Sequence, residues 1–438
     1  MGKLTRLAKL TLCRVAGFML PAALLAAPAA ATQAPGVADP STYCDLQSAV
    51  RIEREFDRGR LMPISAYDDD PFVRSAGVEC VPDQGFHRAD DGTLYLWTPR
   101  VTVYNESKIY RRDATDGIFK PFAWNPWPAY TAANADGSFR FPGEPRFPLF
   151  LIERGPDGKP ILRDGLQVWT PLDLHLGMTT AFEAATKVKG AAEDWSGRLV
   201  DWGVDGVLGI ETAGFVDLNA FYSPSTRMLF FGVIPYRLRG TTEVKMFETA
   251  TSWEMAAHEA AHAVHNALKP NVDQTDPGFN TWGESFADQM QMWTSLRDPG
   301  RVRGLLAGPE LDQSNALSRS GEVYGALVGD RPAMRDAVND ATVSTTEDEV
   351  HDRSEVLTGA LYRLFVTIYN EARRRSPERA LEQAGATLGI FLMHTTDYTP
   401  ENQMTLEDVG KAYLKARSRF IQTPWTKRWR YHPKKPSK

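Results

Sequence analysis

Two histidines and a glutamate with the spacing of a metal site lie in the middle of the chain, within the run His258-Glu259-Ala260-Ala261-His262. In a helix, residues four apart lie on one face, about one turn from each other, so both imidazoles can reach the same ion. Neutral imidazole is a good zinc ligand, and a neighbouring carboxylate that does not bind the metal can accept the proton of an attacking water. The run therefore predicts a zinc site with His258 and His262 as ligands and Glu259 as general base.

A third ligand is predicted from a second segment, Trp282 to Asp288. Glu284 and Asp288 are four residues apart and would share a helix face. The segment also carries an apolar stripe that would dock the helix into a core, formed by Phe286, Met290 and Trp293. We expect Glu284 to bind the zinc and Asp288 to accept a hydrogen bond from a ligand histidine, which would orient its ring.

Two other positions are less suitable as the third ligand. His265 would lie two turns from His258, about 10 Å along the helix axis, too far for both to bind one ion with His262 between them. We expect His265 to pack near the ligands without binding the metal. Position 268, where a longer HExxHxxGxxH pattern places its third histidine, is Leu268.

The zinc helix is predicted over residues 251–268. Thr251 and Glu254 can form a capping box at its start, and Pro270 should end it after Lys269. Other helices are predicted over 178–199, 282–293, 354–375, 377–394 and 405–420, and β-favouring segments over 206–233. The second half of the chain is thus expected to be mainly helical.

The first part of the chain has a different character. Residues 32–170 are rich in turn residues between short alternating runs, such as 93–97 and 101–104, which predicts a β-rich N-terminal domain. The aromatic group there is expected to pack under a Pro-rich loop and comprises Phe122, Trp124, Trp127 and Tyr130. Asp68 to Asp70 lack the alternating spacing of a calcium loop and are expected to form a solvated turn.

The two ends of the chain predict export. Basic residues precede a short apolar stretch, Val15–Ala27, and Ala29 to Ala31 offer a cleavage site, so residues 1–31 are typical of a signal peptide. The mature protein is expected to be secreted or periplasmic, without stable insertion in a membrane. The basic tail, 425–438, is expected to be a solvated terminus.

The cysteines and the overall charge bear on compartment and partners. Removal of Cys13 with the signal peptide would leave Cys44 and Cys80, for which we expect a disulfide in an oxidising compartment. The formal net charge of −5 and the absence of an extended basic segment outside the tail predict no nucleic-acid partner. With 42% hydrophobic residues among 438, the chain has the composition of a globular protein.

In this combination of elements the chain resembles the thermolysin-like neutral metallopeptidases, gluzincins whose third zinc ligand is a glutamate on the helix after HExxH. In that family an edge strand with the pattern NAFW precedes the zinc helix and binds the substrate backbone. This chain has Asn219-Ala220-Phe221-Tyr222 at the corresponding place, followed by an aromatic-Gly pair at 231–232. The resemblance implies that Asn219, Ala220 and Phe221 bind substrate.

Two further elements extend the resemblance over roughly residues 175–420. Val350 and His351, followed by Ser354 and a helix, match a family element whose histidine donates to the oxyanion, which implies that role for His351. The DYTP run at 397–400 and the helix after it are similar to the family's C-terminal end. The implied fold is α+β, a two-lobed zincin catalytic domain. Its N-lobe, 171–269, would carry the edge strand and the HExxH helix, and its helical C-lobe would span 270–424.

The chain also departs from the family at several positions. Gly283 replaces the family's asparagine before the glutamate ligand, and Ala287 replaces the serine before the second acidic residue. The counterpart of the arginine that binds the substrate carbonyl could be Arg319, Arg301 or neither of them, and a counterpart of the transition-state tyrosine is not found. Calcium is a possible cofactor, but most of its ligands in the family cannot be traced in this sequence.

These observations together predict an exported zinc-dependent endopeptidase that acts on peptides or proteins, with zinc as its cofactor. Two alternatives belong to other functional classes. The first is a catalytically inactive protein that keeps the zincin fold as a binding module. The second is an exported surface- or carbohydrate-binding protein, led by its aromatic N-terminal domain, in which the metal is structural.

Overall fold

The computed structural model describes most of the chain from residue 85 to residue 420. The described residues are 61–67, 76–82, 85–125, 130–141, 152–169, 174–237, 244–325, 332–374 and 376–420, the first two ranges as backbone only. Several sequence-based expectations fall outside them. These are the signal peptide, the basic tail, Asp68 to Asp70, Trp127 and the Cys44 half of the expected disulfide.

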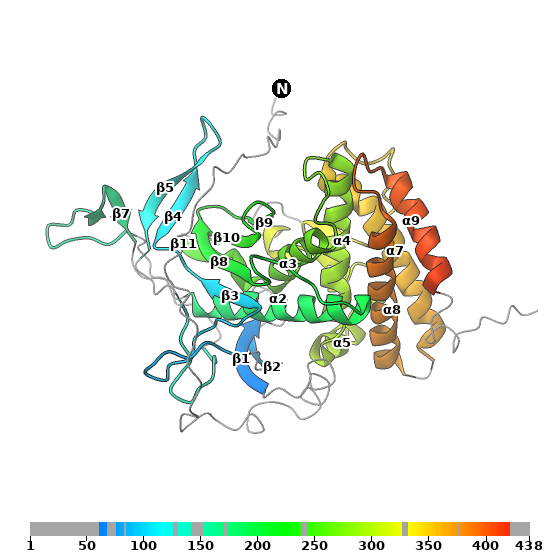
Figure 1. The fold of residues 1–438 in the computed structure, drawn as a ribbon, viewed down its shortest axis with the longest axis horizontal. Helices are drawn as coiled ribbons and strands as arrows, with labels where there is room; N and C mark the ends of the chain where they lie inside the picture. Colours follow the sequence, from blue (N-terminus) through cyan, green and yellow to red (C-terminus); the bar gives the residue numbers. More distant parts are fainter. Residues whose placement is uncertain are drawn as a thin grey trace, which may run out of the picture.

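The described part of the chain is α+β, as predicted, with a mixed sheet beside a helical lobe (Figure 1). The strands of the main sheet are β3 (Val101–Tyr104), β4 (Lys108–Arg112), β5 (Phe119–Trp124), β6 (Leu162–Arg163), β7 (Leu166–Val168), β8 (Leu208–Phe215), β9 (Ala220–Ser223), β10 (Met228–Arg237) and β11 (Val244–Glu248). Their order is β11-β10-β8-β4-β5-β7-β6, with β3 also paired to β8 and β9 to β10. Two short antiparallel pairs lie apart from it: β1 (Leu61–Tyr67) with β2 (Ala76–Pro82), and β12 (Arg319–Ser320) with β13 (Arg335–Asp336).

This sheet is continuous across residue 170, where the sequence analysis placed a domain boundary. The early strand β3 runs parallel to β8 from the later region, with Val101 opposite Leu208 and Tyr104 opposite Glu211. The run 93–97 makes only isolated bridges instead of the expected strand. The division into two domains stays a prediction, while the described residues of both regions share one sheet.

Helix α2 (His175–Ser196) covers one face of the sheet and packs against β3, β8 and helix α3 (Trp253–Leu268). In β3 the buried residues are Val101 and Val103, as expected for a strand whose alternate side chains face a core. The side chains from α2 and the sheet belong to one hydrophobic cluster that continues into the helical lobe. Helix α3, which carries His258 and His262, is therefore anchored to both halves of the molecule.

The helical lobe follows the sheet in sequence. Its helices are α3 (Trp253–Leu268), α4 (Pro277–Ser295), α5 (Pro299–Leu306), α6 (Glu322–Tyr324), α7 (Val350–Ala372), α8 (Pro377–Tyr398) and α9 (Leu406–Phe420). The predicted long helices are confirmed, with shifted ends. Helix α4 begins before residue 282 because Asp276 caps it, accepting hydrogen bonds from the backbone N–H groups of Gly278 and Phe279.

The start of α3 differs from the capping box predicted at Thr251 and Glu254. Ser252 is the N-cap, and its side chain accepts from the N–H of Met255. The hydroxyl of Thr251 donates to the carbonyl of Glu248 instead, and Glu254 accepts from the N–H of Gly321. Thr251 is thus used in a local contact and Glu254 in a tertiary one, and the helix begins at Trp253, two residues later than predicted.

Gly232 explains the aromatic-Gly pair that precedes the zinc helix. A Cβ atom at this position would lie 2.2 Å from the carbonyl oxygen of Asp217. The close approach lets the N–H of Gly232 donate to the carbonyl of Asn219 at 2.9 Å, which holds the segment before β9 against β10. Only a residue without a side chain allows this approach.

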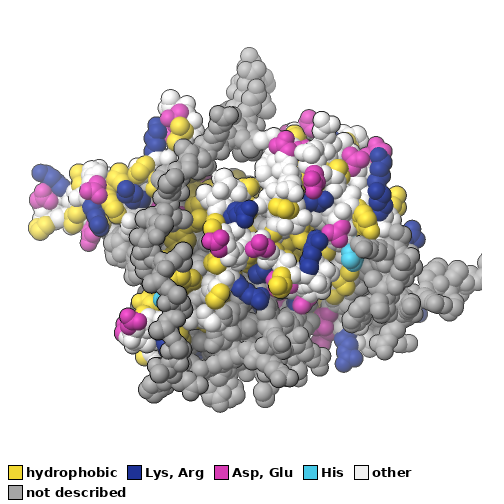
Figure 2. Space-filling model, in the orientation of Figure 1, with side chains coloured by type: hydrophobic (Ala, Val, Ile, Leu, Met, Phe, Trp, Pro, Cys, Tyr) yellow, Lys and Arg dark blue, Asp and Glu magenta, His cyan; other side chains and the backbone are white. Residues whose placement is uncertain are grey.

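Acidic and basic side chains are interspersed on the described part of the face shown in Figure 2. That face has no extended patch of a single sign, in line with the near balance of 50 basic and 55 acidic residues in the sequence. Among the described residues, no helix is long and apolar enough to span a bilayer.

Candidate metal centre

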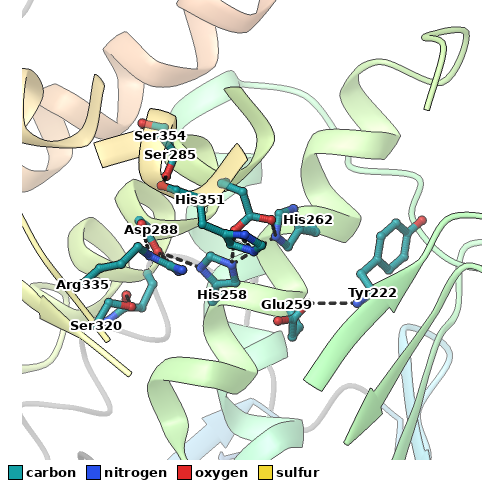
Figure 3. A network of polar contacts seen from close by, with 12 residues as sticks. Tyr222, His258, Glu259, His262, Ser285, Asp288, Ser320, Arg335, His351 and Ser354 are labelled. Carbon is teal, nitrogen blue, oxygen red and sulfur yellow. Dashed lines mark hydrogen bonds and ion pairs between the residues drawn. The ribbon is translucent and has the colours of Figure 1, made fainter. Parts of the chain in front are cut away.

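The three residues predicted as ligands converge between helices α3 and α4. The Nε2 atoms of His258 and His262 lie 3.1 Å apart. The Glu284 carboxylate reaches both, with Oε2 3.3 Å from Nε2 of His258 and Oε1 3.5 Å from Nε2 of His262. One ligand atom from each residue lies within 4.8 Å of the others. Figure 3 shows the two imidazoles pointing toward one another from α3.

This donor set fits a divalent cation such as zinc. Two imidazole nitrogens and a carboxylate oxygen are the ligands of many catalytic zinc sites. Oε2 of Glu284 is buried without a hydrogen-bond donor, a costly arrangement unless a cation compensates it. Although burial alone would lower the pKa of His258, the adjoining Asp288 and Glu284 carboxylates raise it to about 10. At His258 the two carboxylates therefore outweigh the cost of burying a positive charge.

Asp288 lies close to one of the two histidines, with Oδ1 2.9 Å from Nδ1 of His258. Arg335 in turn donates a bidentate pair of hydrogen bonds to Asp288, from Nε to Oδ2 at 2.9 Å and from Nη2 to Oδ1 at 2.7 Å. Despite burial, the charge of Arg335 helps to hold the pKa of Asp288 at about 2. A buried chain of contacts thus runs from Arg335 through Asp288 to His258 (Figure 3).

Arg335 is the site residue that the sequence analysis missed. Arg319 is paired with Glu322, and Arg301 lies over the ring of Trp253 at 3.7 Å. Arg335 is the arginine that the structure brings to Asp288. No local pattern marked it, because it lies in the short strand β13, far along the chain from both helices.

Glu259, the expected general base, is held by the edge strand. Its Oε2 accepts a hydrogen bond of 2.9 Å from the backbone N–H of Tyr222 in β9. Burial raises the pKa of Glu259 to about 7, against the opposing charge of His258. A carboxylate with such a pKa can both accept and return a proton near neutral pH.

His351 lies at the start of α7 and faces Glu284. Its Nε2 is 3.5 Å from Oε2 of Glu284, and its Nδ1 is 2.7 Å from Oε1 of Glu349. Glu349 is also the N-cap of α7, which orients the imidazole and the helix with one carboxylate. The buried hydroxyls of Ser285 on α4 and Thr358 on α7 lie 2.8 Å apart and hold the two helices together.

His265 packs beside the ligands without joining them. Its ring stacks between Phe279 and Phe286, with centroids 4.6 and 4.7 Å away. Burial lowers the pKa of His265 well below its usual value, so the ring is neutral at physiological pH. A Cβ atom added at Gly283 would lie 3.3 Å from Nδ1 of His265. A side chain at position 283 would therefore be tightly packed against His265.

The backbone of β9 has two carbonyls available to a ligand. The carbonyl of Asn219 accepts from Gly232 and that of Ser223 from Arg227, so alternate residues of β9 face β10. Ala220 and Tyr222 therefore turn their backbone groups away from β10. The N–H of Tyr222 is bonded to Glu259 and that of Ala220 to Oδ1 of Asn219. Their carbonyls therefore point toward the open edge of β9.

Phe221, on the opposite face of β9, contributes its ring to an aromatic cluster. The ring centroids of Phe215 and Phe230 lie 5.3 and 5.2 Å from that of Phe221. Phe119, from β5 of the early region, stacks on Phe221 at 6.3 Å. The structure thus brings the three predicted substrate residues, Asn219 to Phe221, to the edge beside the zinc helix. The early strands contact that edge.

The described members of the aromatic group in the early region pack against other side chains. Trp124 is buried and lies under the cations of Arg163 and Lys108, at 4.2 and 5.4 Å. Phe122 packs edge-on against Trp169 at 6.1 Å, while Tyr130 stacks on Trp97 at 5.8 Å. Within the described residues, the group of His258, His262 and Glu284 is the one set of three or more ligand-type side chains that could share an ion.

Known proteins show only weak similarity to this chain. No family model matches the chain, and neither does any curated protein. Among solved structures, the chain is similar to the precursor of protealysin, a metalloproteinase from Serratia proteamaculans. The two are 14% identical with a TM-score of 0.37, over 58% of this chain and 77% of that one. Because this similarity is weak, the site residues themselves carry the functional assignment.

Proposed function

We propose that the protein is a zinc-dependent endopeptidase. The single observation that carries the proposal is the convergence of His258, His262 and Glu284 beside a buried carboxylate, Glu259, that is bonded to an open sheet edge. The group has three protein ligands, whereas a structural zinc usually has four, so the arrangement favours a catalytic site. Retention of Glu259 beside intact ligands argues against an inactive binding module.

His258, His262 and Glu284 would hold the metal, and Asp288 would orient the His258 ring through its Nδ1 atom. Bound there, a zinc ion would polarise a carbonyl group and lower the pKa of a water molecule to about 7. Arg335 keeps Asp288 ionised and in place, which fixes the position of the first ligand. The protein thereby builds a rigid site from two helices.

The substrate peptide would lie along β9. Its N–H groups can donate to the carbonyls of Ala220 and Tyr222, since an extended peptide adds to a sheet edge through backbone hydrogen bonds. Glu259 would accept a proton from the attacking water and return it to the leaving amine. His351, oriented by Glu349, would donate from Nε2 to the oxyanion.

Export of the mature protein by a signal peptide, and with it a secreted or periplasmic location, belongs to the same proposal. It is supported by the basic and apolar pattern of residues 1–31. Cleavage by a signal peptidase is tested by N-terminal sequencing of the mature protein. A first residue near 32 is expected.

The decisive experiment compares the wild type with Glu259→Gln. Glutamine keeps an oxygen that can accept from Tyr222 but cannot take a proton, so zinc content should be unchanged and cleavage of a denatured protein should be lost. Glu407→Gln, at an exposed position on α9, is the matched control and should behave as the wild type. A chelator should abolish wild-type cleavage, and added zinc should restore it.

Cleavage that survives in Glu259→Gln would place the chemistry elsewhere. A purified wild type that binds no zinc would refute the metal site itself.

A further inference from the structure

Tyr222 touches the zinc helix at two separate points. Its backbone N–H donates to Oε2 of Glu259 at 2.9 Å, and its phenol hydroxyl donates to Oδ1 of Asn266 at 3.0 Å. Both acceptors lie on α3, and Tyr222 lies on β9, the strand beside it. Figure 3 shows the backbone contact and the ring of Tyr222 extending from the strand.

The separation of the two acceptors makes this a two-point attachment. Glu259 and Asn266 are seven residues apart on α3, which places them on one helix face, about two turns and 10 Å from each other. One contact would fix only the distance between strand and helix. Two contacts about 10 Å apart also fix the angle between them, because a rotation of β9 would break one of the bonds.

The surroundings of Tyr222 favour persistence of the hydroxyl contact. Burial raises the pKa of the Tyr222 phenol to about 12, so the hydroxyl remains a hydrogen-bond donor throughout the working pH range. The neighbouring residue, Phe221, is held on the opposite face of the strand by the aromatic cluster described above. Strand β9 is thus secured on both faces, and the hydroxyl of Tyr222 secures the face toward α3.

We propose that Tyr222 and Asn266 are a pair of positioning residues that hold β9 at the angle at which its backbone orients the base, Glu259. This inference rests on the proposed peptidase function. Without the hydroxyl contact, β9 can tilt while the metal ligands on α3 and α4 stay in place. The N–H of Tyr222 then no longer holds the Glu259 carboxylate in one orientation. Loss of the hydroxyl contact should therefore slow the chemical step and leave substrate binding little changed.

The test is a double-mutant cycle with Tyr222→Phe, Asn266→Ala and the combined variant. Each single variant should lower kcat about tenfold, with KM changed by less than about threefold and zinc content unchanged. The combined variant should be no slower than either single one, because both remove the same contact. Tyr362→Phe, on α7, is the matched control, since it removes a different Tyr–Asn hydrogen bond, in which the Tyr362 hydroxyl accepts from Asn315 at 2.8 Å. Its kcat should equal that of the wild type.

Four results would overturn the pairing. They are wild-type kcat in Tyr222→Phe, additive losses in the combined variant, a rise in KM alone, or an equal fall of kcat in Tyr362→Phe. The proposed function fails separately, if the wild type shows no zinc-dependent cleavage or if Glu259→Gln remains active. An active wild type with an inactive Glu259→Gln and an unaffected Tyr222→Phe would refute the positioning pair alone.

Discussion

At the scale of single residues, the centre is a set of buried charges that compensate one another. Asp288 is a buried carboxylate that faces Arg335, and the partly buried carboxylate of Glu284 faces the imidazole of His258. Burial without such partners would cost several kcal/mol for each charge. The pairing of charges lowers the free-energy cost of burying these residues. The same carboxylates favour the binding of a divalent cation. Metal affinity and stability are therefore coupled here.

Asp288→Asn is expected to weaken zinc binding about 10- to 100-fold, because the amide no longer balances the charge that the ligand His258 carries when bound to a cation. The measurement is a competition titration against a chelator of known affinity. Asp298→Asn is the matched control. Asp298, the N-cap of α5, also forms an ion pair, with Lys187 at 3.3 Å, but lies outside α3 and α4. Equal zinc affinity in the wild type and Asp288→Asn would show that Asp288 does not support the ligand.

Glu355 on α7 predicts a pH dependence of stability. Burial raises the pKa of Glu355 from its ordinary 4.5 to about 7, against the opposing charge of Arg335. Further carboxylates that add to the rise are Asp288, Asp352 and Asp336. Because the folded-state pKa is raised, the contribution of Glu355 to stability is present below pH 4.5 and is lost as the pH rises to about 7.

The melting temperature of the wild type relative to Glu355→Gln should therefore fall between pH 4.5 and about pH 7 and level off above that. Glutamine is neutral throughout, so this variant removes only the titration of that one group. A constant difference between the two melting curves across this range would contradict the buried position of the carboxyl.

At the scale of elements, the centre depends on helices that approach closely. Helix α4 must pass close enough to α3 for Glu284 to reach both histidines, and it is held in turn by α7 and α8. Small residues make such approaches possible. Gly389 on α8 lies against the buried ring of Trp195 on α2, where a Cβ atom would be 2.3 Å from the ring atom Cδ2.

Gly389→Ala is expected to destabilise the protein by about 1–3 kcal/mol, because the added methyl group overfills a packed contact between α8 and α2. Gly410→Ala is the matched control on α9, where nothing lies within 4 Å of the added atom. The free energy of unfolding of that variant should be unchanged or up to about 1 kcal/mol higher, because alanine has a higher helix propensity than glycine. Urea unfolding midpoints compare the two, and equal midpoints would disprove the tight contact.

At the scale of the whole molecule, strands from before and after residue 170 form one sheet. Val101 and Val103 of β3 belong to the same hydrophobic cluster as residues of α2, and Phe119 of β5 contacts Phe221 of the edge strand. A propeptide that is removed on activation would be expected to leave the core of the remaining protein intact. Removal of residues 85–169 would instead expose β8 and one side of that core.

A chain shortened to residues 171–438 is therefore expected to fail to fold cooperatively, whereas the chain from residue 32 should unfold in one transition. Circular dichroism during thermal unfolding measures both. Isolation of a fully active natural form of the protein that begins near residue 171 would contradict this expectation. It would identify the early region as a propeptide.

The sequence by itself predicted which three side chains converge at the candidate centre and which helices carry them. The spacing of His258 and His262 follows from helix geometry, and the apolar stripe beside Glu284 requires that helix to pack inward, so both are local properties. Tertiary structure alone decided the rest. Arg335 meets Asp288, and Tyr222 meets Glu259 and Asn266, through contacts between residues distant in sequence, which no local periodicity encodes. The shared sheet likewise depends on pairing of β3 with β8, whose register is set by the folded core.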